Sequence, residues 1–305
     1  MTQIESRSST DALAARPDQS ESEFPRRTGR WELAALAAEG SLARVYRARP
    51  TGSPSDRPAA YALKLLKPQW QNDPRAIGML AREAYIGRNL SHPHLVPILA
   101  ASVRRAPRFL VTPWLDGSTL KDLMATGRQL DLPVALWIVR QVAEALDALH
   151  RAGWMHGDIK PGNVFLSPEG HVTLLDLGFA RRHDETGSAV DRCVMGTYGY
   201  IAPELITSAI RADVRSDIYS LGVVLFELFA GRLPFIGNDL AQLAEQHRQA
   251  APPNLYRLAP QLTIDVVRLV HEMLAKEPLR RPQTPTELID RLAALEIVTF
   301  SERAL

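Results

Sequence analysis

The stretch from Trp154 to Arg181 reads WMHGDIKPGNVFLSPEGHVTLLDLGFAR and places polar residues around two short apolar runs. Asp158 and Asn163 come before the first run, VFL, and Asp176 directly follows the second run, VTLL. Oxygen donors from Asp and Asn suit a hard cation such as Mg²⁺. Because Asp, Asn and Gly are also common in ordinary loops, a plain loop is the alternative for this stretch taken alone.

The composition limits the class of protein. A chain of 305 residues is long enough for one large domain or for two lobes that each bury a core. The formal charge of +2 is too small to indicate nucleic acid or an anionic membrane as the main partner. The single cysteine, Cys193, excludes an internal disulfide and a cysteine-built zinc site, which fits a reducing compartment.

Targeting signals are missing from the sequence pattern. The most apolar run, LGVVLFELFAG, is short and is interrupted by Glu227, so it does not reach the roughly 18 apolar residues of a membrane span. The first residues, MTQIESRSST, lack the apolar core of a secretion signal. The sequence therefore predicts a cytoplasmic protein without a membrane span. Residues 1 to about 28 are polar and predict a disordered leader.

The apolar pattern divides the rest of the chain into two parts. From Trp31, short apolar runs alternate with Gly, Ser and Pro clusters, which is typical of antiparallel strands joined by hairpins. The Ala- and Leu-rich run at 31–40 leaves a helix as the alternative there. One helix is predicted at 73–92, and further strands at 94–105 and 108–117. After Asp116 the pattern is mostly helical, and helices are expected at 118–127, 132–153, 216–232, 239–249, 263–276 and 284–295.

The order of these lobes and motifs resembles a protein kinase, specifically the bacterial serine/threonine kinases of eukaryotic type. The resemblance covers about Trp31 to Ala294. It implies a bilobal α+β fold, with a small antiparallel sheet and one helix ahead of a larger, mainly helical lobe. The expected divisions are a leader at 1–28, a kinase domain at 29–298 with N-lobe 29–112, hinge 113–117 and C-lobe 118–298, and a tail at 299–305.

The resemblance implies transfer of the γ-phosphoryl group of ATP to Ser or Thr hydroxyls of protein substrates, with Mg²⁺ or, as an alternative, Mn²⁺. Asp158 matches the catalytic aspartate, which orients the substrate hydroxyl and accepts its proton. Lys160 matches the lysine that steadies the transferred phosphate. Asn163 and Asp176 match the two metal ligands. The motif DIKPGN favours Ser and Thr over Tyr as the acceptor.

Further residues match the ATP site. Lys64 matches the lysine that contacts the phosphates and pairs with a helix glutamate, here Glu83; an edge-strand charge and a solvated helix face are the alternatives. The loop AAEGSLARV aligns with the kinase pattern G-x-G-x-x-G-x-V, with Ala38 in place of the first glycine, and keeps only Gly40. We expect weaker ATP affinity from this loss of backbone freedom. The remaining matches, Val45 and Ala62, lie in the runs VYRA and YALK, the predicted strand pair that follows this loop.

The hinge residues are unusual. Thr112 matches the residue at the back of the adenine pocket. Pro113 has no N–H but offers its carbonyl, and Leu115 offers both N–H and C=O to the purine. A proline-broken linker between the lobes is the alternative.

Four residues match structural positions of the kinase family. Thr197, in GTYGYIAPE, matches the activation-segment threonine that contacts the catalytic aspartate and lysine. Glu204 is expected to pair with Arg281. Asp217 is expected to brace the catalytic loop from a buried helix.

Two glycines depart from the family pattern. Gly157 stands where kinases that depend on activation-loop phosphorylation usually carry an arginine. We therefore hypothesise that phosphorylation of Thr186 or Ser188 is not the main switch. Gly87 costs about 1 kcal/mol relative to alanine in a helix. It is also expected to leave an apolar stack unfilled, so that the helix position depends on a partner or on nucleotide.

Two other functional classes compete with an active protein kinase. A pseudokinase, acting as a nucleotide-responsive scaffold, is favoured by the degenerate glycine loop and Gly87 and opposed by the intact polar residues. A small-molecule kinase shares the aspartates but lacks the GTYGYIAPE segment. The substrate, the upstream signal and the oligomeric state stay open. A composition-based hypothesis makes the leader hydroxyls autophosphorylation targets, namely Ser6, Ser8, Ser9, Thr10, Ser20 and Ser22.

Overall fold

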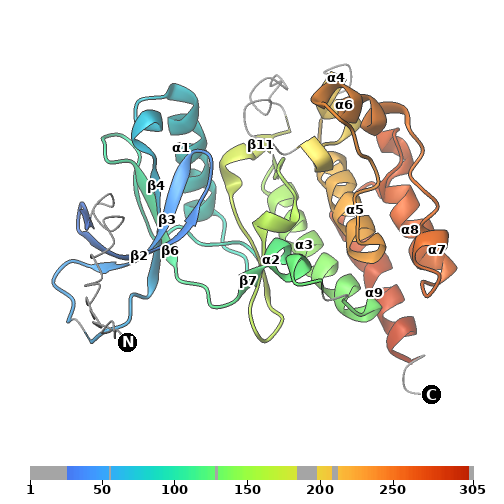
Figure 1. Cartoon of the computed structure of the whole chain (residues 1–305), viewed down its shortest axis with the longest axis horizontal. Coiled ribbons are helices and arrows are strands. Elements are labelled where there is room, and N and C mark those ends of the chain that lie inside the picture. Colours follow the sequence, from blue (N-terminus) through green and yellow to red (C-terminus); the bar gives the residue numbers. More distant parts are fainter. Residues whose placement is uncertain (1–25, 55, 128–129, 184–197, 208–211, 302–305) are drawn as a thin grey trace, which may run out of the picture.

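The computed structural model describes residues 26–54, 56–127, 130–183, 198–207 and 212–301. The predictions on nearly all of the leader and on Thr186, Ser188, Cys193 and Thr197 lie outside these residues. Figure 1 shows strands and one helix on one side of the molecule and most helices on the other. No helix within the described ranges is both long and apolar enough to cross a bilayer.

The smaller lobe is built on one antiparallel sheet with the order β1-β2-β3-β4-β6-β5. The run at 31–40 forms a strand, as predicted, because pairing along β3 overrides the helix propensity of Ala and Leu. Two register shifts in that pairing bend the hairpin. The strands are β1 (Arg27–Thr28), β2 (Trp31–Glu39), β3 (Ala43–Pro50), β4 (Tyr61–Leu66), β5 (Ala100–Ser102) and β6 (Phe109–Pro113).

The predicted strand at 94–105 is only partly confirmed, because it is strand only from Ala100 to Ser102. Residues before it turn toward the other lobe, where Leu95 forms a parallel bridge with Leu174. The N–H of Val96 donates to the carbonyl of Leu174 in the larger lobe, and only from Leu99, which donates to Val111 of β6, does the chain bond to the sheet.

Helix α1 (Pro74–Asn89) begins as its sequence indicates. The side chain of Asp73 accepts a hydrogen bond from the backbone N–H of Ala76 at 2.8 Å, and proline occupies the first helical position. Its buried residues pack on one face of the sheet. The shared core contains Ala43, Leu66, Ala76, Leu80, Ala84, Ile98 and Leu110.

The expectation that Gly87 leaves an apolar stack unfilled is wrong. A Cβ built on Gly87 would lie 2.5 Å from Cγ1 of Ile98, so the space is already occupied. The N–H of Ile98 also donates to the carbonyl of Gly87 at 3.0 Å. The missing side chain therefore allows close packing of the chain that follows α1.

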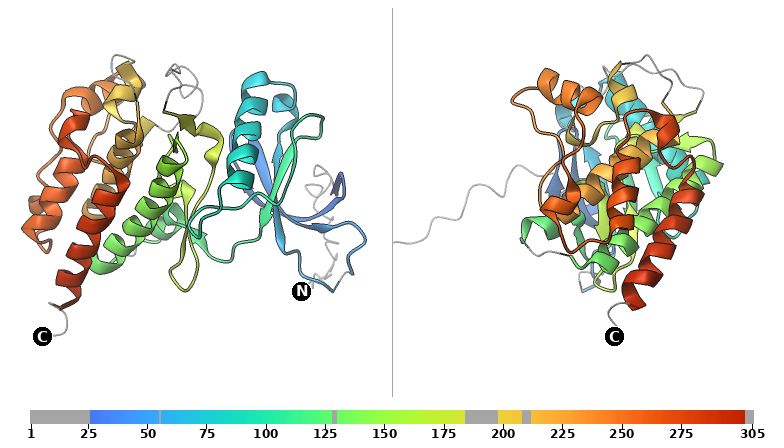
Figure 2. Two further views of the ribbon diagram at one scale, coloured as in Figure 1. Left: turned by 180° about the vertical axis from the view of Figure 1, so that it is seen from behind. Right: turned by 90° about the vertical axis from the view of Figure 1, so that its right-hand side faces the viewer.

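The larger lobe is helical around α5 (Val214–Ala230), which is buried on nearly all sides. Asp213 caps its start, and Gly231, with φ +66°, ends it. Figure 2 shows that α9 lies along α3. The other helices are α2 (Leu120–Ala125), α3 (Leu132–Arg151), α4 (Pro203–Thr207), α6 (Leu240–Gln249), α7 (Leu255–Leu258), α8 (Ile264–Met273) and α9 (Pro285–Ser301).

Short strands and 3₁₀ turns lie between the helices and the sheet, at the junction of the lobes. They form two small antiparallel sheets, with the orders β10-β9-β7 and β11-β8. Their bounds are β7 (Ser118–Thr119), β8 (Trp154–Met155), β9 (Val164–Leu166), β10 (Val172–Leu174) and β11 (Arg181–Arg182). This arrangement agrees with the predicted bilobal α+β fold.

Candidate active site

The loop between β8 and β9 holds Asp158 in a network of hydrogen bonds. Its Oδ2 accepts from Nζ of Lys160 at 2.7 Å and from Nδ2 of Asn163 at 2.9 Å. The Asn163 amide also donates to the Asp158 carbonyl at 2.7 Å. Burial raises the pKa of Asp158, although Lys160 opposes this shift. Both side-chain bonds use Oδ2, so Oδ1 is the oxygen left for an incoming donor.

Asp217, buried on α5, fixes the backbone just before this aspartate. Its carboxylate accepts from the N–H of His156 at 2.6 Å and from the N–H of Gly157 at 2.7 Å. A carboxylate that accepts two backbone N–H groups makes charge-assisted hydrogen bonds, which are stronger than neutral ones. The helical core therefore positions the loop directly.

His156 links this loop to the strand that leads to Asp176. Its Nδ1 accepts from the N–H of Asp158 at 3.1 Å, so the ring proton lies on Nε2, which faces the carbonyl of Leu175 at 3.0 Å. Burial lowers the pKa of His156 and favours the neutral ring. Both nitrogens are engaged in fixing the loop, so His156 has a structural role here and is not free to act as a base.

Lys64, Glu83 and Asp176 meet between the sheet, α1 and the turn after β10. Nζ of Lys64 lies 2.7 Å from Oε2 of Glu83 and 3.0 Å from Oδ1 of Asp176. Burial works against the ammonium, but the two carboxylates outweigh it and raise the pKa of Lys64. Burial raises the pKa of Glu83 to about 7, with Lys64 pulling in the other direction. The ammonium of Lys64 thus forms ion pairs with both Glu83 and Asp176.

Asp176 adopts a left-handed backbone conformation, with φ 62° and ψ 77°. Such a conformation costs a residue other than glycine about 1–3 kcal/mol and persists only where the surroundings hold it. Here Lys64 and the N–H of Gly178, at 3.3 Å, both bind Oδ1. Burial opposes ionisation, yet Lys64 outweighs it and lowers the pKa of Asp176. The strained turn therefore presents an ionised carboxylate to the junction of the lobes.

The strands place four predicted nucleotide-site residues on one face of the sheet. Val45 pairs with Lys64 across β3 and β4, and Ala62 pairs with Thr112 across β4 and β6. Directly opposed residues share a face, as do alternate residues on one strand. The four side chains therefore line the same side as Glu83 and Asp176.

The loop that replaces the glycine-rich pattern is tied down at its tip. The N–H of Gly40 donates to the carbonyl of Ala43 at 2.9 Å, and the N–H of Lys67 donates to that of Leu42 at 2.9 Å. The indole of Trp70 donates to the carbonyl of Ser41 at 3.1 Å. These bonds hold the β2–β3 turn, next to the Ala38–Val45 pair.

At the hinge, the hydroxyl of Thr112 donates to the carbonyl of Pro113 at 3.0 Å. The carbonyl of Pro113, which was expected to accept from the purine, therefore accepts from Thr112 in this structure. The backbone N–H of Trp114 donates to the carbonyl of Ala60 at 2.9 Å, which continues the β4–β6 pairing. Leu115 follows in the connection to the larger lobe.

A family model described as the protein kinase domain matches residues 34–291. The chain belongs to this family. A probable serine/threonine-protein kinase of Clostridium perfringens is 33% identical over 270 residues, which is 88% of this chain and 38% of that protein. Serine/threonine-protein kinase PrkC of Bacillus subtilis is 31% identical over 261 residues, 86% of this chain and 40% of PrkC. Serine/threonine-protein kinase PknB of Mycobacterium tuberculosis is 31% identical over 265 residues, which is 85% of this chain and 42% of PknB.

The chain thus spans about two fifths of the length of these relatives. Residues 34–291, which the family model matches, include every predicted site residue from Ala38 to Arg281.

The larger lobe of the kinase domain contains a buried ion pair. Nη1 and Nη2 of Arg281 donate to the two carboxylate oxygens of Glu204 at 2.7 and 2.9 Å. Ser216 also donates to Glu204, at 2.6 Å. The structure brings this predicted pair together, whereas Thr197 lies outside the residues that it describes.

Two features of this kinase domain were missed by sequence reasoning. Gly157 has φ +79°, a conformation that favours glycine, so its residue type has a backbone cause in addition to the missing phosphate partner. Arg47 places its guanidinium carbon 4.6 Å from the ring centroid of Trp114 at the hinge. The available signal was that Arg47 and Val45 are alternate residues of β3, so their side chains lie on the same face of the sheet.

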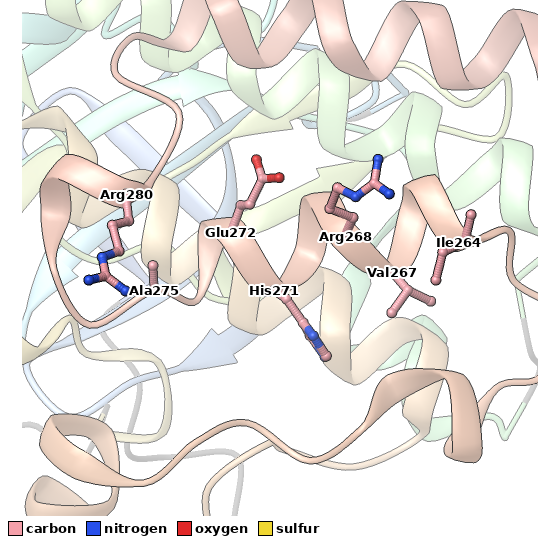
Figure 3. A pocket seen from close by; sticks show the side chains of 7 residues that line it. All are labelled: Ile264, Val267, Arg268, His271, Glu272, Ala275 and Arg280. Carbon is pink, nitrogen blue, oxygen red and sulfur yellow. The ribbon is translucent and has the colours of Figure 1, made fainter.

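A separate hollow of about 420 Å³ lies on α8, away from the junction of the lobes (Figure 3). Figure 3 shows Arg268 and Glu272 on one side of the helix and His271 on the other. None of the predicted site residues lines it, so it is not the nucleotide site.

Proposed function

We propose that this kinase domain transfers the γ-phosphoryl group of ATP to Ser or Thr hydroxyl groups of protein substrates. The supporting observation is that Asp158, Lys160 and Asn163 form one bonded cluster, with Oδ1 of Asp158 outside the bonds that fix it. Phosphoryl transfer depends mainly on positioning and electrostatic stabilisation. A cluster whose side chains hold one another in place supplies the positioning.

The residues fit the divalent metal that this family uses with ATP. Asn163 donates through Nδ2, which leaves its carbonyl oxygen for a cation, and Asp176 is bonded through Oδ1, which leaves Oδ2. Oxygen donors of this kind suit Mg²⁺, which we propose as the metal, with Mn²⁺ as the alternative. When bound, the metal neutralises the negative charge of the triphosphate.

The protein's own groups then have distinct roles in the proposal. Lys64 binds the phosphates, and Glu83 holds its ammonium at 2.7 Å. Asp158 orients the acceptor hydroxyl and takes its proton, a role that suits a carboxylate whose pKa is raised by burial. Lys160, at 2.7 Å from Asp158, stabilises the negative charge on the transferred group.

The adenine ring is proposed to lie against Val45, Ala62 and Thr112, beside the hinge. Rotation of the Thr112 hydroxyl would release the carbonyl of Pro113 for the purine. The tied β2–β3 turn supports weaker phosphate contact than a loop with three glycines would give.

The pseudokinase alternative loses one of its two supports. The space beside Gly87 is filled by Ile98, and the Lys64–Glu83 pair is formed at 2.7 Å. The single cysteine and the small net charge support a further proposal, that the domain acts on proteins in a reducing compartment.

The experiment is incubation of the purified chain with γ-labelled ATP, Mg²⁺ and a generic basic protein. Asp158→Asn removes the proposed base and keeps the size of the side chain, so label transfer should fall by at least about 10²-fold. Asp265→Asn is the matched control, because Asp265 is exposed on α8 and forms a surface ion pair with Arg268.

Transfer that is equal in the two variants would contradict the assignment of Asp158. Nucleotide binding without transfer in the unaltered chain would favour a scaffold. Binding is followed by the shift in thermal unfolding that ATP and Mg²⁺ produce.

A further inference from the structure

The two lobes carry opposite net charges, which the small net charge of the whole chain conceals. Residues 26–112 contain fifteen Lys or Arg and five Asp or Glu, a net charge of +10. Residues 113–305 contain nineteen Lys or Arg and twenty-four Asp or Glu, a net charge of −5. Thirteen of the fifteen basic residues in the smaller lobe are arginines. The smaller lobe therefore attracts anions although the chain as a whole is nearly neutral.

Two of these arginines lie in a row across the first three strands of the sheet. Arg27 of β1 and Arg49 of β3 are both direct partners of Glu32 on β2. Directly opposed residues share a face of the sheet, so the three side chains lie side by side. Nε of Arg49 is 3.0 Å from Oε2 of Glu32. One carboxylate thus stands between two guanidinium groups.

Three more arginines lie at the same end of the sheet. The carbonyl of Arg30 accepts from the N–H of Thr51, just after β3, at 2.8 Å. The carbonyl of Arg57 accepts from Nη1 of Arg49 at 3.4 Å. Arg26 directly precedes β1. We define the arginine patch as Arg26, Arg27, Arg30, Arg49 and Arg57.

The positive charge of the arginine patch is largely uncompensated. The four arginines other than Arg49 are exposed, and none of them forms an ion pair with a carboxylate among the residues that the structure describes. Glu32 is bonded to Arg49, and Asp56, next to Arg57 in the chain, is the other acidic residue nearby. Five arginines against two carboxylates leave an excess of three positive charges.

The chemistry of the arginine patch favours an acidic protein segment as its partner. The planar guanidinium group bonds a carboxylate through two N–H groups at once. Side chains on one face of an extended peptide repeat about every 7 Å, so neighbouring glutamates reach different arginines. None of the exposed large apolar side chains of the described residues lies in the patch to anchor it in a bilayer. The ring of Trp31, beside Arg30, packs against Tyr61 with centroids 5.1 Å apart and is not available for stacking on a nucleic-acid base.

We propose that the arginine patch is a docking site for an acidic segment of the protein substrate, separate from the residues around the acceptor hydroxyl. The proposal rests on the proposed function, because the docked partner is the substrate. Figure 1 shows the start of the described chain, in dark blue, on the side of the smaller lobe that faces away from the larger lobe. A segment bound there leaves the junction of the lobes open. Docking raises the local concentration of the acceptor, so it lowers KM and leaves kcat unchanged.

The first measurement is the binding of a labelled peptide of glutamate and glycine, which has no acceptor hydroxyl, followed by fluorescence anisotropy. The triple variant Arg27→Gln, Arg30→Gln and Arg57→Gln should bind it at least about tenfold more weakly, and added salt should weaken binding to the unaltered chain. These arginines are exposed, so their replacement should leave the unfolding temperature unchanged. The matched control removes the same charge from exposed arginines of the larger lobe, by Arg232→Gln, Arg257→Gln and Arg268→Gln, and should keep the affinity of the unaltered chain.

The second measurement is phosphoryl transfer to a serine peptide with and without the glutamate segment, joined by a glycine-rich linker of about 20 residues, which spans about 25 Å on average. The segment should lower KM by at least about tenfold in the unaltered chain and in the control variant, with kcat unchanged. In the triple variant of the arginine patch this advantage should disappear.

Equal affinities of the two triple variants for the glutamate peptide would overturn the proposal, because the binding would then reflect net charge alone. Tighter binding of a DNA duplex or of phosphatidylglycerol vesicles, lost in the patch variant, would assign the patch to another partner and would also overturn it. A KM that the glutamate segment does not change overturns the docking role. Peptide binding through the patch without transfer to any peptide overturns the proposed function instead.

Discussion

Replacing Glu204 by glutamine should unfold the kinase domain more easily than any exposed charge replacement nearby. The Glu204 and Arg281 side chains are 2% and 0% exposed. Glutamine keeps the shape but removes the charge, and its amide N–H groups would face the guanidinium. The Arg281 guanidinium would keep backbone acceptors such as Ala275, at 2.8 Å, but no anion.

Removing one partner of a buried ion pair costs about 3–5 kcal/mol, because the other charge stays buried without compensation. With a urea slope of about 3 kcal/mol per M for a chain of this size, the unfolding midpoint should fall by about 1–2 M. The assay is urea unfolding followed by circular dichroism.

The neighbouring pair gives the matched control. Glu277 lies 2.8 Å from Arg280, the residue before Arg281, but these side chains are 66% and 73% exposed. Glu277→Gln should leave the midpoint unchanged within error, since water solvates both charges. Equal midpoints for Glu204→Gln and Glu277→Gln would refute the argument that burial sets the cost.

Three further predictions concern the smaller lobe and the catalytic loop. Gly87→Ala should lower thermal stability and the transfer rate because its Cβ meets Ile98, whereas Gly78→Ala on the same helix, with nothing within 4 Å, should stabilise by up to about 1 kcal/mol. The transfer rate should fall as pH drops below about 7, the value to which burial raises the pKa of Glu83, because protonation breaks its ion pair; a flat profile in steady-state assays would contradict this. Gly157→Ala should destabilise by about 1 kcal/mol in urea unfolding because of its positive φ, and an unchanged midpoint would count against that strain.

The sequence predicted the two lobes and most elements because their signals are local. Helical spacing and a capping Asp73 define α1, and Asp213 and Gly231 delimit α5. The motif residues around Asp158 and Asp176 could also be identified, since their spacing along the chain is itself the signal. Their roles remain predictions.

Features that depend on contacts across the fold could not be predicted. Leu95 and Val96 have the pattern of a strand, but their partner is Leu174 of the other lobe, which no local pattern indicates. The space beside Gly87 depends on a residue that returns to it after the helix has ended. The two partners of His94, Val172 and Glu144, come from different elements, so no local pattern indicates them.

The close packing of Gly87 against Ile98 has a mechanical consequence. It makes the end of α1 a fixed point, so the helix can tilt about that end more easily than it can slide along its axis. Glu83 is four residues away, about 6 Å along the helix. A tilt of about 20° would therefore move it by about 2 Å, enough to separate it from Lys64, now 2.7 Å away. A short lever arm of this kind turns a small rotation of one helix into the making or breaking of a single ion pair.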